Sequence, residues 1–269
     1  MKDPRVERTR YHNLNDIIFI AIAAVLSGAE SWNEIEFYGE MKEEWLKEVL
    51  ELPNGIPSHD TFNRLFSALD PDEFEKCFLN WIKSVNEITK GEVVSIDGKT
   101  IRGSKRLGFK TATHIVSAWA DKNELVLGQI KVDEKSNEIT AIPKLLENLL
   151  IKDCIVTIDA MGCQKKIARK IVSKQAAYIL AVKENQKELF EDIQDSFSVL
   201  NPSDTSEDID YGHGRIETRK CYILTDLSLV EEASKWKGLT SIVKIERERY
   251  FKATGKKETE SSYYISSLK

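Results

Sequence analysis

The chain has 269 residues, of which 41% are apolar and 31% are charged. This balance is typical of a folded globular protein and excludes a mainly disordered or collagen-like chain. Its 39 Lys and Arg against 44 Asp and Glu give a net charge of −5, so a surface coated in basic charge for nonspecific nucleic-acid binding is not expected. The length allows one large domain or two modest ones.

The apolar runs and the cysteines indicate the cellular compartment of the protein. The longest apolar run, residues 17–26, has ten residues, whereas a membrane-spanning helix needs about 20. The four cysteines form no CxxC pair and no Cys/His cluster, so a zinc module is not expected and a reducing cytosol fits. We therefore expect a cytoplasmic protein with no membrane partner.

Residues 1–90 have the pattern of a helical domain. Helices are expected over 13–27 and 31–50, after a cap at Ser58, and from Pro71 onward, where apolar residues recur at helical spacing. A cluster of Pro and Gly at 53–57 predicts a turn between them.

The pattern changes after Gly91 to short apolar runs separated by helical segments. Strands are expected at 93–97, 114–119, 125–130, 155–158 and 177–182, with helices at about 139–150, from 164 and at 186–197. The first three strands suit an antiparallel meander, and the later alternation of strand and helix suits parallel strands. Residues 91–198 are therefore predicted to form an α/β core, a mixed five-stranded sheet with helices in the order of the ribonuclease-H-like fold.

The last part of the chain, residues 199–269, is predicted to be a β-rich insertion. A polar loop is expected over 199–211, followed by strands at 215–224, 241–251 and 261–268. Their alternation of polar and apolar residues favours a separate antiparallel sheet beside the core, with one face in water. The sequence stops on an apolar strand that lacks a cap, from which we expect that the chain is truncated.

Two aspartates stand at the ends of predicted strands. Asp97 ends the first strand and Asp159 the fourth, and both are followed by glycines that permit tight turns. In a sheet of the proposed order these strands are neighbours, so the two carboxylates would sit side by side and need a cation between them. Mg²⁺ prefers such oxygens, and Mn²⁺ is a possible substitute. Each aspartate alone could instead be an ordinary turn or helix-cap residue.

Several polar residues near these turns are candidate DNA contacts. Lys and Arg could hold phosphates beside the metal, and amides at a helix start could do the same; the candidates are Lys99, Arg102, Lys183, Asn185, Gln186 and Arg215. The alternatives are a solvated basic loop, a helix cap at Asn185, and a surface ladder of paired charges around Arg215.

The chain resembles bacterial insertion-sequence transposases of the H-repeat-associated group, which have a DDE catalytic core of the ribonuclease-H-like fold. The resemblance lies in the segments 95–99, 157–162, 181–186 and 212–219. It implies that Asp97 and Asp159 are the first two catalytic carboxylates, that Mg²⁺ is the cofactor, and that double-stranded DNA at transposon ends is cleaved and joined to target DNA in the bacterial nucleoid. An active member is expected to be a homo-oligomer, because two ends must be joined.

The family's third carboxylate lies on a helix that has no match in this sequence. Glu217 is the one nearby acid in a matching motif, and it is a weak candidate because it belongs to the insertion. With two carboxylates we expect weak or no catalysis, since a two-ion site needs more negative ligands. The alternatives to an active transposase are a non-catalytic remnant that binds DNA or protomers, and a free-standing ribonuclease-H-like nuclease.

Overall fold

The computed structural model describes residues 1–85, 90–101, 113–132, 137–212 and 214–268. The chain divides into two compact units, Met1–Ser84 and Val85–Lys269, and each is described by itself. Within the described residues, no helix is long and apolar enough to cross a membrane.

The first unit is a helical bundle. It contains a short turn of 3₁₀ helix and five α-helices: η1 (Glu7–Thr9), α1 (Leu14–Leu26), α2 (Trp32–Met41), α3 (Glu43–Leu46), α4 (His59–Ala68) and α5 (Pro71–Val85). Ser31 and Glu34 form a capping box that starts α2. Ile17, Ile20 and Phe62 are fully buried in the core between α1, α2 and α4, so burial of apolar faces holds the bundle together.

The second unit is built on one large mixed sheet with helices. Its strands are β1 (Val93–Thr100), β2 (His114–Ala120), β3 (Leu125–Val132), β4 (Ile155–Ile158), β5 (Ala177–Val182), β6 (Asp204–Gly212), β7 (Arg215–Leu224), β8 (Ser241–Phe251) and β9 (Lys257–Ser266). The spatial order is β3-β2-β1-β4-β5-β9-β8-β7-β6. β1, β4 and β5 are parallel to one another, and the other neighbouring pairs are antiparallel.

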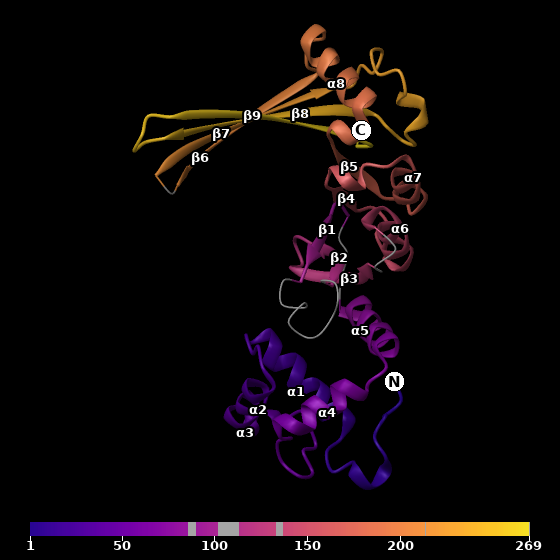
Figure 1. The fold of residues 1–269 in the computed structure, drawn as a ribbon, viewed down its shortest axis with the longest axis vertical. Coiled ribbons are helices and arrows are strands. Elements are labelled where there is room, and N and C mark those ends of the chain that lie inside the picture. Colours follow the sequence, from indigo (N-terminus) through magenta and orange to yellow (C-terminus); the bar gives the residue numbers. More distant parts are fainter. Residues whose placement is uncertain (86–89, 102–112, 133–136, 213, 269) are drawn as a thin grey trace. The chain divides into compact units, whose positions relative to one another are not determined.

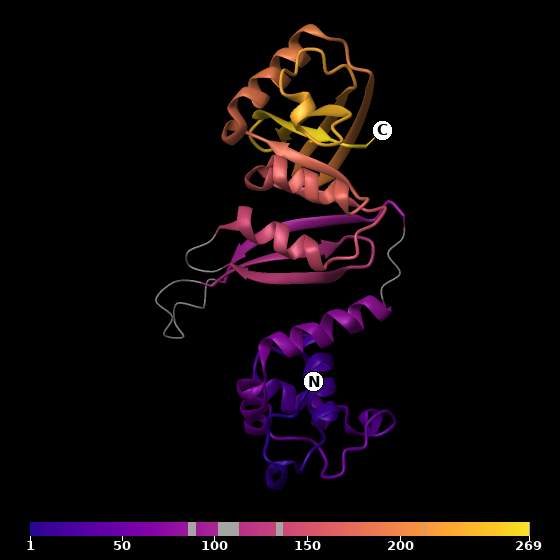
Figure 2. The same ribbon diagram turned by 90° about the vertical axis from the view of Figure 1, so that its right-hand side faces the viewer.

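Helices α6 (Glu138–Asn148) and α7 (Lys165–Ser173) lie against one side of the core strands (Figures 1 and 2). The residues that alternate toward this side are buried, as Ile96, Val156 and Leu180 illustrate. Helix α8 (Lys187–Val199) contacts the same side through Phe190, whose ring packs edge-on against Tyr263 of β9. Asp97 therefore lies in β1, and Asp159 directly follows β4, in a sheet that these helices cover on one side.

The expected separate C-terminal sheet is wrong, because the late strands continue the central sheet. β9 pairs with β5 in the register Ile179↔Ser266 to Val182↔Tyr263, and β8, β7 and β6 follow it outward as a long four-stranded arm (Figure 1). The open edge of β5 has backbone groups that a further strand satisfies, and the alternation pattern cannot distinguish a new sheet from an extended one.

The polar segment predicted as a loop is also partly a strand. Residues 204–212 form β6, which pairs along its whole length with β7. Nearly all its side chains are exposed, so backbone hydrogen bonds rather than apolar burial hold it in place. A polarity pattern could not reveal such a strand, since both faces are wet.

Candidate active site

The two aspartates follow directly on paired residues of neighbouring parallel strands. Ile96 of β1 is in register with Ile158 of β4, and Asp97 and Asp159 are the next residues along each strand. One pair earlier, the Thr157 hydroxyl donates to Ser95 Oγ at 3.2 Å, which marks the face shared by the odd-numbered residues. The predicted adjacency of the two strands is confirmed, and both aspartates continue that same face.

Asp159 has a structural role of its own. It caps the short 3₁₀ helix η3 (Ala160–Gly162), and its Oδ1 accepts a hydrogen bond from the Gly162 backbone N–H at 3.3 Å. A Cβ on Gly162 would lie 2.2 Å from Ile158 Cγ2, so only glycine fits there. The cap fixes the direction of the Asp159 side chain, which lines an open pocket of about 1210 Å³.

Asp97 is 59% exposed and has Lys99 Nζ at 4.0 Å. The next residue, Gly98, packs against the side chains of Glu138 and His114, a polar pair that sequence reasoning did not identify. His114 Nε2 is 2.6 Å from Glu138 Oε1, and the His114 Nδ1 is 3.0 Å from the Thr100 hydroxyl. The one sequence signal for this group is Asn137, which caps α6 and so places Glu138 in the first helical turn.

Asn185 and Gln186 brace the loop that holds Asp159. They belong to η4 (Glu184–Gln186), just beyond β5. The Asn185 amide donates to the Ala160 carbonyl at 2.6 Å, and the Gln186 amide donates to the Cys163 carbonyl at 2.9 Å. Both predicted DNA contacts are thus engaged within the protein, while Lys183 lines the pocket beside Asp159.

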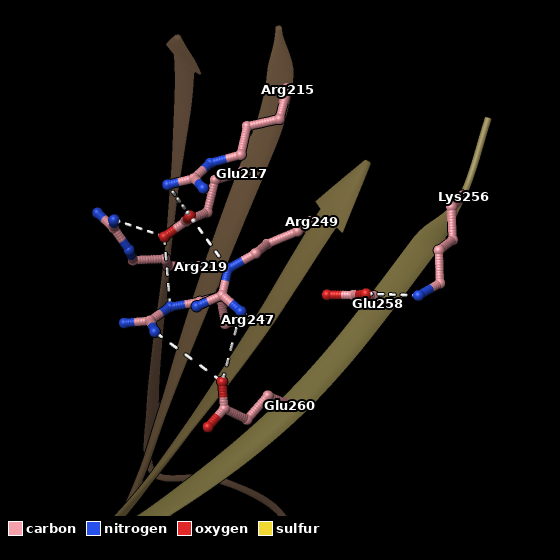
Figure 3. A network of polar contacts seen from close by, with 8 residues as sticks. All are labelled: Arg215, Glu217, Arg219, Arg247, Arg249, Lys256, Glu258 and Glu260. Carbon is pink, nitrogen blue, oxygen red and sulfur yellow. Dashed lines mark hydrogen bonds and ion pairs between the residues drawn. The ribbon is translucent and has the colours of Figure 1, made fainter. Parts of the chain in front are cut away.

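Arg102 lies outside the described residues, and Arg215 lies in a cluster of arginines on the arm. Arg215 and Arg219 of β7 and Arg247 and Arg249 of β8 surround the carboxylate of Glu217 (Figure 3). We call these four residues the arginine cluster.

Glu217 is poorly suited to be the third metal ligand. Its side chain is 6% exposed, and both carboxylate oxygens are in ion pairs with arginines. Burial would raise the Glu217 pKa, but the hydrogen bond from Arg219 and the charges of the cluster outweigh it and hold the pKa below its usual value. In addition, β7 is four strands from β4 in the sheet.

The described residues fit one divalent ion better than two. Asp97 and Asp159 offer the hard oxygen ligands that Mg²⁺ prefers, and water and phosphate oxygens can complete such a shell. Among residues 1–85, 90–101, 113–132, 137–212 and 214–268, no group of three or more His, Cys, Asp or Glu side chains comes together as a metal site.

Comparison with known proteins identifies the family. The model of the transposase DDE domain matches residues 88–229, and the model of the region associated with that domain matches residues 1–82. The chain therefore belongs to the DDE-domain transposase family.

Individual relatives cover nearly the whole chain. "Putative transposase YncI" of Escherichia coli O157:H7 is 45% identical over 95% of this chain and 67% of its own length. "H repeat-associated putative transposase YhhI" of E. coli K12 is 43% identical over 95% of this chain and 70% of its own length. "Uncharacterized protein in dhlA 3'region" of Xanthobacter autotrophicus is 38% identical over 98% and 91%. The relatives of this chain thus include a protein described as H repeat-associated.

Proposed function

We propose that this chain is an insertion-sequence transposase that cleaves DNA at the ends of its element and joins them to target DNA in a metal-dependent reaction. The observation that carries the proposal is the register of β1 and β4, where Ile96 pairs with Ile158 and an aspartate follows each. Family membership supports the same reaction class. Double-stranded DNA is the substrate, Mg²⁺ the proposed cofactor, and a homo-oligomer the form that would join two ends.

We also infer that β1 to β5 with α6 to α8 form a ribonuclease-H-like core. The order β3-β2-β1-β4-β5, with parallel pairing of β1 with β4 and of β4 with β5, supports this inference. The proposed domains are residues 1–90, 91–198 and 199–269, and the third adds the arm to the core.

Each residue of the proposed site has a task. Asp97 and Asp159 would hold the metal, whose chemistry is to activate the attacking oxygen and stabilise the leaving oxygen of a phosphodiester. Lys183 is placed at the N-terminal end of η4 and lines the pocket with Asp159, so it can bind a non-bridging phosphate oxygen. Asn185 and Gln186 act as positioning residues, because their hydrogen bonds hold the loop of Asp159.

Two measurements test the proposal. The first is Mn²⁺ binding by electron paramagnetic resonance, where Asp97→Asn and Asp159→Asn should each weaken binding at least tenfold. The second is metal-dependent nicking of duplexes that carry the element's own ends, which both variants should abolish. The matched control is Asp195→Asn, an exposed aspartate of α8, which should leave both readouts unchanged.

The outcomes separate the proposed function from its alternative. Metal binding that depends on both aspartates, together with nicking, supports a catalytic transposase. Metal binding that neither variant affects would overturn the proposed site. Duplex binding without metal binding would favour a non-catalytic DNA-binding remnant. Nicking of any duplex regardless of sequence would indicate a free-standing nuclease.

A further inference from the structure

The arginine cluster is organised around one buried carboxylate. Glu217 Oε1 is 2.6 Å from Arg219 and 3.3 Å from Arg247, and Glu217 Oε2 is 3.4 Å from Arg215 and from Arg249 (Figure 3). Four guanidinium groups this close would repel one another without a central anion. Glu217 therefore holds the cluster together and limits the directions in which its arginines point.

The arginines still have donors to offer a ligand. Their side chains are 28–43% exposed, and each guanidinium carries five N–H groups, of which Glu217 uses only a part. A rigid array of guanidinium forks on a strand pair matches the oxygens of phosphate groups, to which arginine binds in bidentate fashion.

The cluster faces the same side of the sheet as the two aspartates. Thr157 of β4 pairs with Ile179, which pairs with Ser266 of β9. Alternation along β9 then carries this face through Tyr264 to Glu260, which pairs with Arg247 of β8. Because β9 is antiparallel to β5, Glu260 lies beyond the carboxyl end of β5, the same end at which Asp159 follows β4.

Glu260 connects the cluster to the pocket of Asp159. It lines that pocket, and its Oε2 is 3.8 Å from Arg249 and 4.0 Å from Arg247. With its side chain 60% exposed, these long ion pairs are of the kind that contributes about 0–1 kcal/mol. A phosphate oxygen could replace this carboxylate at little cost, whereas the buried Glu217 would stay.

The spacing suits a DNA duplex that reaches both places. Two strand spacings separate β4 from β9, and Glu260 lies four residues beyond Tyr264, which is level with Asp159. At about 4.8 Å per strand and 3.3 Å per residue, the offset is roughly 16 Å. This corresponds to about five base pairs of duplex along the helix axis.

We propose that the arginine cluster, held in place by Glu217, is a docking surface for the phosphodiester backbone of DNA beside the cleavage site, and that Glu260 occupies a phosphate position in the free protein. The proposal rests on the proposed function in that DNA is the substrate. It assigns Glu217 as a positioning residue and Glu260 as an anion that the bound DNA displaces.

The proposal predicts opposite effects for two acids, which a simple charge effect does not. Removing any acid should tighten DNA binding if net charge alone matters. We expect Glu260→Gln to lower the Kd for a short duplex about threefold to fivefold, because it frees a phosphate position. Glu217→Gln should raise the Kd at least threefold, because the arginines lose their common anchor.

A neighbouring acid on the same face provides the matched control. Glu258 also lies on β9, two residues from Glu260, but its side chain pairs with Lys256 at 2.7 Å (Figure 3). Glu258 is in register with Arg249 and feels its charge, but its ion pair is with Lys256. Glu258→Gln therefore removes the same charge without freeing an ion-pair position on the arginine cluster, so it should change the Kd less than twofold. Equal effects of Glu258→Gln and Glu260→Gln would overturn the assignment of Glu260.

The guanidinium geometry is tested without touching the buried carboxylate. The double variant with Arg247→Lys and Arg249→Lys keeps both charges but loses the fork geometry, so it should weaken binding at least threefold with an unchanged salt slope. Arg247→Ala with Arg249→Ala should reduce the slope of log K against log salt by about 2, since each phosphate contact contributes about 0.9. If the lysine variant binds as tightly as the parent chain, the guanidinium geometry of the arginine cluster is not needed for binding, and the proposal is refuted.

All titrations are done with the full chain in a metal chelator, so they report binding and not cleavage. Circular dichroism establishes which variants are folded, and the two lysine substitutions decide the case if Glu217→Gln does not fold. A folded Glu217→Gln chain that binds as tightly as the parent refutes the positioning role. If the predicted order of affinities appears while the Asp97 and Asp159 tests fail, the docking surface stands and the proposed catalysis falls.

Discussion

The side-chain amide of Asn185 donates a hydrogen bond to the Ala160 carbonyl at 2.6 Å, which ties the segment after β5 to the turn that begins at Asp159. The Gly162 N–H within this turn bonds to the Asp159 carbonyl at 3.1 Å. The two segments therefore support each other at the proposed site.

Asn185→Ala should loosen this turn. Losing one hydrogen bond is expected to cost about 1 kcal/mol, and the Gly162 amide should exchange its hydrogen several-fold faster than in the parent chain. Hydrogen exchange measured by NMR tests this, with Gln194→Ala, an exposed residue of α8, as the control. Unchanged exchange at Gly162 would show that the turn is held without Asn185.

Gly98 and Glu138 should be energetically coupled. A Cβ on Gly98 would lie 2.1 Å from Glu138 Oε1, so Gly98→Ala must push the flexible carboxylate away from its hydrogen bond with His114. We expect Gly98→Ala to lower the free energy of unfolding, measured by urea denaturation, by about 1–3 kcal/mol. In a Glu138→Ala background the same change should cost about 1 kcal/mol less. Strictly additive losses would mean that other neighbours resist the new methyl group.

The cysteines should differ sharply in reactivity. Cys163 is fully buried and burial raises its thiol pKa to about 12, while burial raises that of Cys154 to about 11. Because the thiolate is the reactive form, the exposed Cys77 should react first with a thiol reagent near neutral pH. Cys77→Ser should remove the fast phase, and all remaining thiols should react after unfolding. A fast phase that survives this substitution would contradict the prediction.

The strands of the core were predictable because their apolar runs are short and bounded by turn residues. The pairing of β1 with β4 followed from their places in the α/β alternation. The continuation of the sheet through β9 was not predictable, since the pairing of Val182 with Tyr263 joins residues far apart in sequence. The alternation of polar and apolar residues along a strand shows which face is exposed to solvent. It does not show which strand pairs with it.

The candidate site was predictable in part for the same reason. Asp97 and Asp159 could be identified because each stands at the end of a predicted strand. A strand end can be recognised from the local sequence alone. The roles of Asn185 and Glu217 depend on partners elsewhere in the chain: the Ala160 carbonyl in one case and arginines of β7 and β8 in the other. A local motif cannot distinguish a residue that contacts a ligand from one that positions its neighbours.

One ion pair in the helical unit has opposite pKa shifts on its two members. His59 Nδ1 of α4 is 2.6 Å from Glu36 Oε2 of α2, and Asp60 Oδ1 lies 3.7 Å from His59 Nε2. The hydrogen bond with Glu36 raises the His59 pKa above 6.5, and the same bond lowers the Glu36 pKa below 4.5. The raised His59 pKa stabilises the fold below pH 6.5 and loses effect as pH rises through the folded value; the lowered Glu36 pKa stabilises it above pH 4.5 and loses effect as pH falls.

The stabilising effect of this pair should therefore be largest between pH 4.5 and 6.5, where both groups are charged. His59→Gln and Glu36→Gln should each lower the thermal midpoint of the helical unit slightly at about pH 5.5, and the difference from the parent chain should shrink toward pH 9. The effect is small because the His59 side chain is 48% exposed. Glu40→Gln, an exposed acid of the same helix α2, is the control and should show no such pH profile. A midpoint difference for His59→Gln that is equal at both pH values would show that its loss acts through packing rather than through charge.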